Sequence, residues 1–531
     1  MRILFSLYFL FIIRSVIFAN DGYPRNINAD VLHYEFALTI SDSTDKIEGK
    51  TSIKIRFINE AHSISFDLNG INIDGKGMRV ARVSLGAEDT KWEQGNEKLI
   101  VFFENPVKQN DTLDIVIEYS GVPADGLIIS KNKFGNRTFF ADHWPNRAHN
   151  YLPCIDHPYD KAAVDFIITA LDGYNVIASG ILIEESDLPG SSTLTHWSEP
   201  VPLATKVMAF GAAAFAKQLA GTVNDIPVWS WVYPENRNEG FSDYAVAVRP
   251  LEYYSGIIGP YPYEKLANVQ SKTIYGGLEN AGAIFYSEGS VTGLGKAERL
   301  IAHEIAHQWF GNCVTEDDWH HIWLSEGFAT YMTSLYFESF QGRARLESDM
   351  RSAREKVLRY YDTNSKPVID TTITNLMDLL STNSYQKGEW VLHMLRNKLG
   401  DDVFMKGLRL YYERFYNSNA LTKDFKNVME EVSGRNLDKF FQQWLYTSGQ
   451  PELKIWHETG KKKGTIEVYV EQKQEKLFEF NLELLIKDSS QEKIVNIPVN
   501  DRVTKVIVKS KSDSVIVPDP NVNLLFNHVT D

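Results

Sequence analysis

The chain carries a five-residue segment whose side chains match the ligands of a zinc ion. His303 and His307 lie four residues apart, and Glu304 directly follows the first of them. They fall within residues 296–311, where apolar residues recur at spacings of three and four, which predicts a helix. On a helix, positions i and i+4 share one face, so both imidazoles can reach one ion at ~2.0–2.1 Å. A catalytic zinc also needs a third protein ligand and an open position for water.

Glu326 is the candidate for the third ligand. Eighteen residues separate it from His307, and it lies at the start of a second predicted helix, residues 325–342. Gly311 is a plausible end for the first helix, so the chain can reverse and the two helices can pack antiparallel. Two His and one Glu form the ligand set of thermolysin-type zinc hydrolases. The sequence therefore predicts one Zn²⁺ per chain, and the alternative is a buried helix pair whose spacing is coincidental.

Glu304 is not expected to bind the metal. Beside the ion, its carboxylate would act as the general base that takes a proton from the attacking water and passes it to the leaving amine. The pair His320-His321 lies nearby in the sequence. Adjacent side chains point apart on helices and strands, so these two are interpreted as ordinary loop or core histidines.

The segment Gly276-Gly277-Leu278-Glu279-Asn280 indicates an exopeptidase. Two glycines allow a substrate backbone to approach closely. A carboxylate directly after them, Glu279, can pair with the free α-ammonium of a peptide. This pairing would fix the position of the cleaved bond relative to the N-terminus. By spacing alone, Gly-Gly near a glutamate is more often a turn.

These motifs, in this order and at these intervals, resemble those of the gluzincin zinc metallo-aminopeptidase family, which includes membrane alanyl aminopeptidase and leukotriene hydrolase. The form with Tyr275 before the glycines is similar to the leukotriene hydrolase branch and to the three-domain, cold-active bacterial branch. The resemblance extends over nearly everything after residue 19. Further matching segments are Leu152 to Pro158, Trp323 to Tyr331 and Tyr385 to Gly388.

The resemblance implies a role for each matching residue. His303, His307 and Glu326 bind zinc, and Glu304 is the base. In substrate binding, Glu279 anchors the amine, and the neighbouring residues Gly276, Gly277 and Asn280 belong to the same site. Tyr385 stabilises the oxyanion, because a phenol opposite a cation favours charge that grows in the transition state.

The sequence departs from the family pattern at several positions. Leu278 stands where Met or Ala is usual, and Ser325 precedes Glu326 where Asn is common. A second amine contact often precedes the Pro-Cys-x-Asp turn, and Asp142 is the candidate for it here. The large helical C-terminal domain of many relatives is missing, which should leave the site open to longer peptides.

The bulk composition excludes some classes of partner. The 531 residues carry a formal net charge of −14, which argues against nucleic acid because phosphate contacts need clustered Lys and Arg. Residues 1–19 match a secretory signal peptide cleaved near Ala19, the rival being an uncleaved anchor helix. We therefore expect an exported protein, periplasmic or secreted, with no stable membrane span after cleavage.

Cys154 and Cys313 are expected to be buried free thiols, although two cysteines could also form one disulfide. The sequence does not indicate an oligomeric state.

The periodicity divides the rest of the chain into three domains. Residues 20–234 alternate as strands, residues 235–450 have mainly helical spacing, and residues 451–531 return to strands. Together with the resemblance, this predicts a multidomain α+β protein. It has an N-terminal β saddle, a thermolysin-like and mainly helical catalytic domain, a C-terminal β-sandwich and no C-terminal helical solenoid.

The predicted function is zinc-dependent hydrolysis of the N-terminal bond of peptides with a free N-terminus. Two alternatives remain open. One is a non-catalytic peptide-binding relative, against which intact Glu304, Glu326 and Tyr385 speak. The other is a bifunctional epoxide hydrolase and aminopeptidase. That activity needs a specific lipid pocket, which no residue in the sequence indicates. The sequence does not reveal the preferred first residue.

Overall fold

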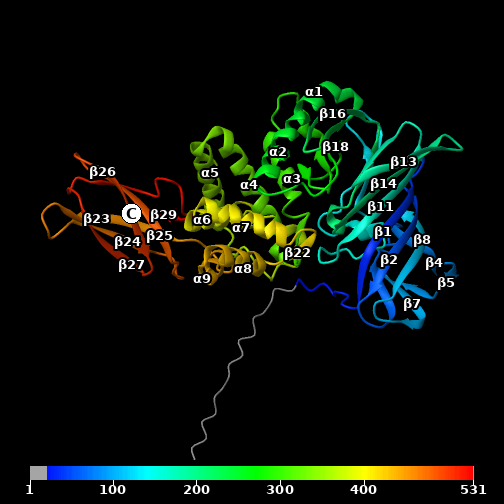
Figure 1. Cartoon of the computed structure of the whole chain (residues 1–531), viewed down its shortest axis with the longest axis horizontal. Coiled ribbons are helices and arrows are strands. Elements are labelled where there is room, and N and C mark those ends of the chain that lie inside the picture. Colours follow the sequence, from blue (N-terminus) through cyan, green and yellow to red (C-terminus); the bar gives the residue numbers. More distant parts are fainter. Residues whose placement is uncertain (1–20, 530–531) are drawn as a thin grey trace, which may run out of the picture.

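A computed structural model of the chain describes residues 21–529 and arranges them as three parts in a row (Figure 1). A β domain from the N-terminal half lies at one end, a mainly helical part lies in the centre, and a smaller β domain lies at the other end. The predicted multidomain fold class is confirmed. The predicted signal peptide, residues 1–19, lies outside the described residues.

The N-terminal domain is built on sheets that place every second side chain in its core. In β2, Ile53, Ile55 and Phe57 are fully buried and the residues between them are not, as the alternation in the sequence predicts. The main sheet has the order β13 (Ile181–Leu188), β14 (Ser192–Leu203), β11 (Ala162–Leu171), β1 (Ala29–Thr39), β2 (Ile47–Phe57), β8 (Thr112–Val122), β4 (Gly77–Leu85), β5 (Glu88–Asp89). Two smaller sheets have the orders β3 (Ala61–Asp67), β7 (Lys98–Val107), β6 (Trp92–Gln94), and β12 (Asn175–Ala178), β15 (Phe210–Ala213), β10 (Arg137–Ala141), β9 (Leu127–Lys131).

The last strands of the predicted N-terminal domain, residues 20–234, pair with strands that follow them in the sequence. The hairpin of β16 (Ala216–Val223) and β17 (Ile226–Val232) pairs through β17 with β18 (Leu266–Ser271), and so joins the sheet of the central domain. That sheet continues through β20 (Ala283–Ser287) to β19 (Gly277–Leu278), which lies at its edge. Strand period alone does not reveal which sheet a hairpin joins, because pairing over long sequence separations decides it.

The central domain packs its helices beside this sheet and places the predicted metal-ligand helices in contact. The helices α3 and α4 contact each other, and α4 also contacts α5 and α6. Glycines with positive φ directly follow α4, α6 and α8, as is common at helix ends (Gly342, Gly400 and Gly434). The helices are α1 (Arg237–Tyr244), α2 (Val248–Ile257), α3 (Glu298–His307), α4 (Trp323–Gln341), α5 (Arg343–Tyr361), α6 (Gly388–Leu399), α7 (Asp401–Arg414), α8 (Thr422–Ser433) and α9 (Asp438–Leu445). A short parallel pair joins β21 (Val314–Glu316) and β22 (Ser418–Ala420).

The C-terminal domain consists of two sheets, which confirms the predicted β-sandwich. Their inward-facing residues, such as Leu482, Leu484 and Ile486, are fully buried. One sheet has the order β27 (Val503–Lys509), β24 (Thr465–Gln472), β23 (Glu452–Thr459), β29 (Asn527–His528), and the other has the order β26 (Glu492–Val499), β25 (Phe480–Lys487), β28 (Val515–Pro518).

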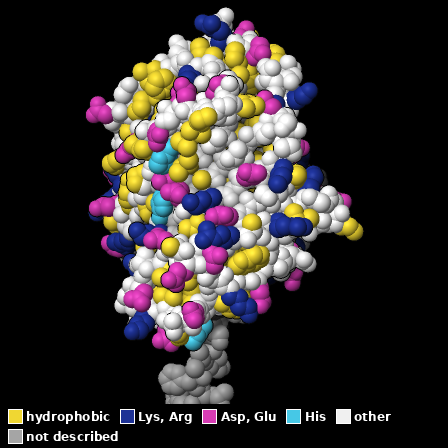
Figure 2. All heavy atoms as spheres, turned by 90° about the vertical axis from the view of Figure 1, so that its right-hand side faces the viewer, with side chains coloured by type: hydrophobic (Ala, Val, Ile, Leu, Met, Phe, Trp, Pro, Cys, Tyr) yellow, Lys and Arg dark blue, Asp and Glu magenta, His cyan; other side chains and the backbone are white. Residues whose placement is uncertain are grey.

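Three further observations bear on the predictions. Cys154 and Cys313 are buried free thiols, as expected. Between residues 21 and 529, no helix combines the length and the apolar character needed to cross a bilayer. On the face that the N-terminal domain presents, basic side chains are interspersed with acidic ones (Figure 2).

Candidate active site

The three predicted metal ligands meet at one point between α3 and α4. The Nε2 atoms of His303 and His307 are 3.1 Å apart, and Oε2 of Glu326 lies 3.4 Å from the first and 3.3 Å from the second. Ligand atoms held ~2.0–2.1 Å from one tetrahedral ion are separated by about 3.3 Å. The triangle therefore has the size that a tetrahedral Zn²⁺ requires.

The chemical state of this triangle also fits a cation. Oε2 of Glu326 is buried and has no hydrogen-bond partner among the described residues, although it lies beside two imidazoles. Burial raises the pKa of Glu326, but the neighbouring His307 and His303 outweigh it and hold that pKa below its ordinary value. Glu326 lies in the first turn of α4, where the helix dipole also favours a carboxylate. A buried carboxylate without a hydrogen bond is a group that a metal ion would satisfy.

A set of contacts behind His307 orients its ring. Nδ1 lies 3.3 Å from the carbonyl oxygen of Phe310 and 3.0 Å from Oγ of Ser325. A carbonyl oxygen only accepts, so Nδ1 carries the proton and Nε2 presents a lone pair to the site. Gly311, with φ of 119°, leaves room for this arrangement, because a β-carbon there would lie 3.1 Å from Nδ1. Ser325 thus contacts a predicted metal ligand from behind.

Glu304 projects into the same pocket as the three predicted ligands. Burial raises the pKa of its carboxyl well above the ordinary value, and the carboxylates of Glu279 and Glu326 add to that shift while His307 opposes it. The backbone of β19 passes directly over Glu304, since a β-carbon on Gly277 would lie 2.6 Å from its Cδ. The carboxyl group therefore sits between the metal triangle and an edge strand, where a general base is needed.

Glu279 presents a buried, unpaired carboxylate oxygen at the other side of this pocket. Its Oε1 has no hydrogen-bond partner among the described residues. Its main chain is fixed, because the carbonyl oxygen accepts hydrogen bonds from Nε2 of Gln308 at 2.9 Å and Nδ2 of Asn312 at 2.6 Å. The carboxylate follows directly on the edge strand β19, whose free side can pair with an extended peptide.

Tyr385 completes the wall of the pocket opposite the edge strand. It lies in a π-helical turn, η8 (Asn383–Lys387), immediately before α6, and such turns are frequent at functional sites. Its ring centroid is 6.0 Å from that of His303. Burial, together with the nearby carboxylates, raises the pKa of the phenol well above its ordinary value, so the group keeps its proton and can donate a hydrogen bond.

Three residues predicted to contact the substrate do not line this pocket. Asp142 is fully buried, because its carboxylate accepts hydrogen bonds from Arg147, from Oγ1 of Thr273 at 2.9 Å and from the main chain of Ile274 at 3.1 Å. It thus fixes the segment before the glycines, and its role as an amine contact stays a prediction. Gly276 and Asn280 are not among the lining residues either.

Sequence reasoning missed several residues that form the pocket. Trp144 and Leu380 line it, and Gln308 and Asn312 hold Glu279 in place. Gln308 directly follows His307, and its position one turn beyond Glu304 was the available signal. The neighbouring His320 and His321 are buried outside the pocket, where His320 donates to the carbonyl of Ile373 and His321 contacts Thr422, as expected for core histidines.

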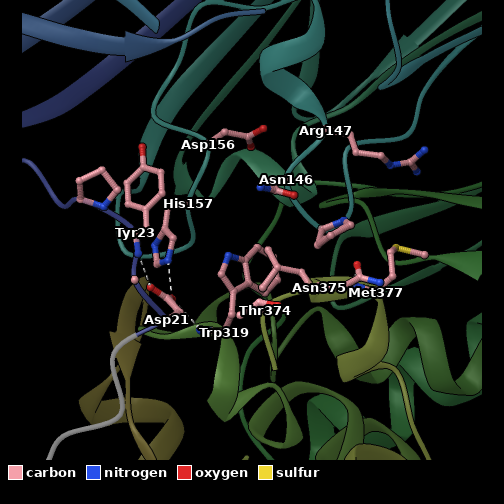
Figure 3. Close-up of a pocket in the computed structure, with 14 residues that line it drawn as sticks. Asp21, Tyr23, Asn146, Arg147, Asp156, His157, Trp319, Thr374, Asn375 and Met377 are labelled. Carbon is pink, nitrogen blue, oxygen red and sulfur yellow. Dashed lines mark hydrogen bonds and ion pairs between the residues drawn. The ribbon is translucent and has the colours of Figure 1, made fainter. Parts of the chain in front are cut away.

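A second pocket of about 490 Å³ is lined by Trp319, Asp21 and His157, among other residues, and Asp21 is already paired there (Figure 3). The carboxylate of Asp21 is 2.6 Å from Nε2 of His157 and accepts a hydrogen bond from the main chain of Trp319 at 3.1 Å. Asp156 is likewise engaged by His149 and Thr205. These contacts connect the start of the described chain to both domains. They also engage the carboxylates of Asp21 and Asp156, so neither is free to bind a ligand.

Fold and site together define a class. The site has the parts of a thermolysin-like metallohydrolase. These are a histidine pair four residues apart on one helix, a glutamate beside the first histidine, a glutamate on the next helix and an edge strand across the pocket. The Peptidase family M1 domain matches residues 243–444, and the Peptidase M1 N-terminal domain matches residues 31–207. The chain belongs to peptidase family M1.

Known proteins with similar sequences and folds agree with this assignment. The chain is 26% identical to probable aminopeptidase 2 of Sulfurisphaera tokodaii over 73% of its length, and 28% identical to aminopeptidase N of Lactococcus lactis over 72%. These matches cover 51% and 48% of the two relatives, so the chain spans about half the length of the curated relatives it matches. The M1 zinc metallopeptidase of Deinococcus radiodurans has the same fold, with a TM-score of 0.68 at 24% identity over 80% of this chain and 96% of that one.

Proposed function

We propose that the chain is a zinc-dependent aminopeptidase that hydrolyses the first peptide bond of peptides with a free N-terminus. The observation that carries this proposal is the unpaired, buried carboxylate oxygen of Glu279 in the pocket that also holds the metal triangle. A buried carboxylate without a partner is costly, and the α-ammonium of a peptide would satisfy it. An endopeptidase, which accepts an uninterrupted chain at this position, has no use for such a charge.

The residues of the pocket divide the reaction among them. His303, His307 and Glu326 would hold the Zn²⁺, which when bound supplies Lewis-acid chemistry to the carbonyl and to the attacking water. Glu279 pairs with the ammonium group, and the edge of β19 aligns the peptide backbone. Glu304 takes a proton from the water and passes it to the leaving nitrogen. Tyr385 donates a hydrogen bond to the oxygen on which negative charge develops.

The test is hydrolysis of a panel of aminoacyl p-nitroanilides covering all unblocked first residues. The expected result is release that a chelator abolishes and that N-acetylation of the substrate also abolishes. Release from N-acetylated peptides would instead indicate an endopeptidase. Zinc-dependent binding of peptides with no hydrolysis of any panel member would leave the peptide-binding alternative.

We also propose that the protein is exported to a periplasm or to the medium. The support is the sequence of residues 1–19, in which a basic residue precedes an apolar run and Ala19 lies at the expected cleavage point. N-terminal sequencing of the protein recovered from its native host is expected to begin at Asn20. A protein that retains Met1 would contradict the proposal.

A further inference from the structure

The π-helical turn that carries Tyr385 also contains Lys387, a buried residue without a part in the reaction described above. The amide of Lys387 donates to the carbonyl oxygen of Thr382 at 2.9 Å, and this hydrogen bond spans five residues and encloses Tyr385. Turns of this kind are rare in proteins, and an unusual backbone conformation persists where the surrounding structure fixes it. The contacts of this turn with its neighbours therefore decide where the phenol lies.

One side of the turn touches the helix that carries Glu326. A β-carbon on Gly327 of α4 would lie 2.9 Å from Cα of Gly388 and 3.1 Å from the carbonyl oxygen of Ser384. The two backbones are thus in direct contact, with no side chain between them. Because Gly327 directly follows Glu326, the turn packs beside one of the predicted metal ligands.

On its other side, Lys387 connects the turn to two further segments. Its Nζ donates to the hydroxyl oxygen of Tyr361 at 2.8 Å and to the carbonyl oxygen of Gly449 at 2.8 Å. Tyr361 is the last residue of α5, and Gly449 lies between α9 and β23, in the segment that leads to the C-terminal domain. These two hydrogen bonds therefore hold the turn from the side opposite α4.

The burial of Lys387 is costly. Its side chain is fully buried, and no carboxylate among residues 21–529 pairs with it, so both of its acceptors are uncharged. Burial lowers the pKa of its ammonium group to about 7. An apolar side chain of similar length would avoid the cost of burying an amine without a counter-charge. What an apolar side chain would lose is the pair of hydrogen bonds.

We propose that Lys387 is a positioning residue, whose two hydrogen bonds hold the turn against α4 and thereby fix the phenol of Tyr385 beside the metal triangle. The inference rests on the proposed aminopeptidase function, in which Tyr385 stabilises the developing charge. A misplacement of about 1 Å can lower a catalytic rate by ~10²-fold. The binding of the substrate amine by Glu279 involves neither the turn nor its anchor. Lys387 therefore affects kcat and leaves KM nearly unchanged.

The experiment is a double-mutant cycle that combines Lys387→Met with Tyr385→Phe and measures hydrolysis of alanine p-nitroanilide. Methionine fills the buried space and removes the amine. We expect Lys387→Met to lower kcat about 5- to 30-fold with KM changed less than about twofold, and Tyr385→Phe to lower kcat about 10²- to 10³-fold. In the Tyr385→Phe background, Lys387→Met should lower kcat by less than about twofold further, because the hydroxyl that it positions is already absent.

Lys265→Met is the matched control. Lys265 is also a buried lysine, whose Nζ donates to the carbonyl oxygens of Ala178 at 2.8 Å and Gly282 at 3.2 Å, but it lies outside the turn. Its effect on kcat should multiply with that of Tyr385→Phe. If the effects of Lys387→Met and Tyr385→Phe also multiply, or if Lys387→Met keeps full kcat, the inference is overturned.

Tyr361→Phe keeps the inference testable if Lys387→Met does not fold. It removes one of the two acceptors of Lys387 and leaves the other, so kcat should fall about two- to fivefold, and this loss should vanish in the Tyr385→Phe background. A loss that persists there would overturn the inference. The proposed function fails separately, if the unmodified enzyme does not hydrolyse the p-nitroanilide or if Tyr385→Phe retains full kcat.

Discussion

Gly277 and Glu304 approach each other so closely that a side chain at position 277 would displace the carboxylate of Glu304. A β-carbon built on Gly277 would lie 2.6 Å from Cδ and 2.7 Å from Cγ of Glu304, closer than any ordinary contact. The edge strand β19 and the carboxylate proposed as the base are thus in direct contact. The absence of a side chain at position 277 therefore fixes the position of the Glu304 carboxylate.

Gly277→Ala is expected to lower kcat/KM for an aminoacyl p-nitroanilide by about 10- to 100-fold, because it displaces the base from its place beside the metal. Gly276→Ala is the matched control. A β-carbon at Gly276 would have its nearest neighbour, Leu300, at 3.8 Å, so its cost should stay below about threefold. Equal effects of the two substitutions would mean that the contact with Glu304 has no catalytic consequence.

Glu304→Gln is expected to keep its metal and to lose turnover. The amide retains the shape of the side chain but accepts no proton, so kcat should fall by about 10²- to 10⁴-fold. Metal content by atomic absorption should remain at one Zn²⁺ per chain, since Glu304 is not one of the three residues of the metal triangle. Turnover at the unmodified rate would show that another group acts as the base.

The metal triangle was predictable from sequence because its geometry is mostly local. His303, Glu304 and His307 share one helix, whose period is visible in the apolar pattern, and Glu326 lies on the next long helix. Glu279 was recognisable only through its glycines and the family resemblance, and Tyr385 only through the resemblance. The structure adds the physical reason for Glu279, which is a buried oxygen without a partner.

Other parts could not be read from the sequence because long-range packing decides them. The sequence did not show that Arg147 and the segment at Thr273 engage the carboxylate of Asp142. Trp144 lies about 160 residues before His303, the closest metal ligand in the sequence. Leu380 comes from a separate turn. The hairpin of residues 216–232 has the period of the N-terminal strands but pairs with the central sheet.

Glu279→Gln is expected to reduce kcat/KM for substrates with a free amine by about 10- to 100-fold, because a neutral amide replaces the charge that pairs with the ammonium. Metal content should be unchanged. Glu264→Gln, at an exposed glutamate outside the pocket, is the matched control and should have no effect. Retention of full kcat/KM in the Glu279 variant would remove the main support for an exopeptidase.

Ser325→Ala is expected to weaken zinc binding. The change removes the hydroxyl 3.0 Å from Nδ1 of His307 and leaves only the longer contact to Phe310. Loss of a contact that orients a ligand ring typically costs about 10- to 100-fold in metal affinity. Competition with a chromogenic chelator measures that affinity directly, and Ser334→Ala, also on α4 but away from His307, is the control. Identical zinc affinities in all three proteins would exclude the role.

Glu389→Gln is expected to change the pH dependence of stability. The carboxyl has a pKa of about 8 in the folded protein, raised by burial from 4.5. Between these values the folded protein binds more protons than the unfolded chain. The free energy of unfolding therefore falls as pH rises through this window, by up to ~1.4 kcal/mol per pH unit. Below about 4.5 the contribution is fully present, and above about 8 it is lost.

Glutamine keeps an acceptor for the hydroxyl of Ser334 and removes the titration. The unfolding temperature of the variant relative to the unmodified protein should therefore increase from pH 5 to pH 8, as measured by circular dichroism. Asp349→Asn is the control, because it also exchanges a carboxyl group for an amide among the residues that line the same pocket as Glu389. If the unmodified protein and the Glu389 variant lose stability in parallel over this range, Glu389 is already ionised in the folded state.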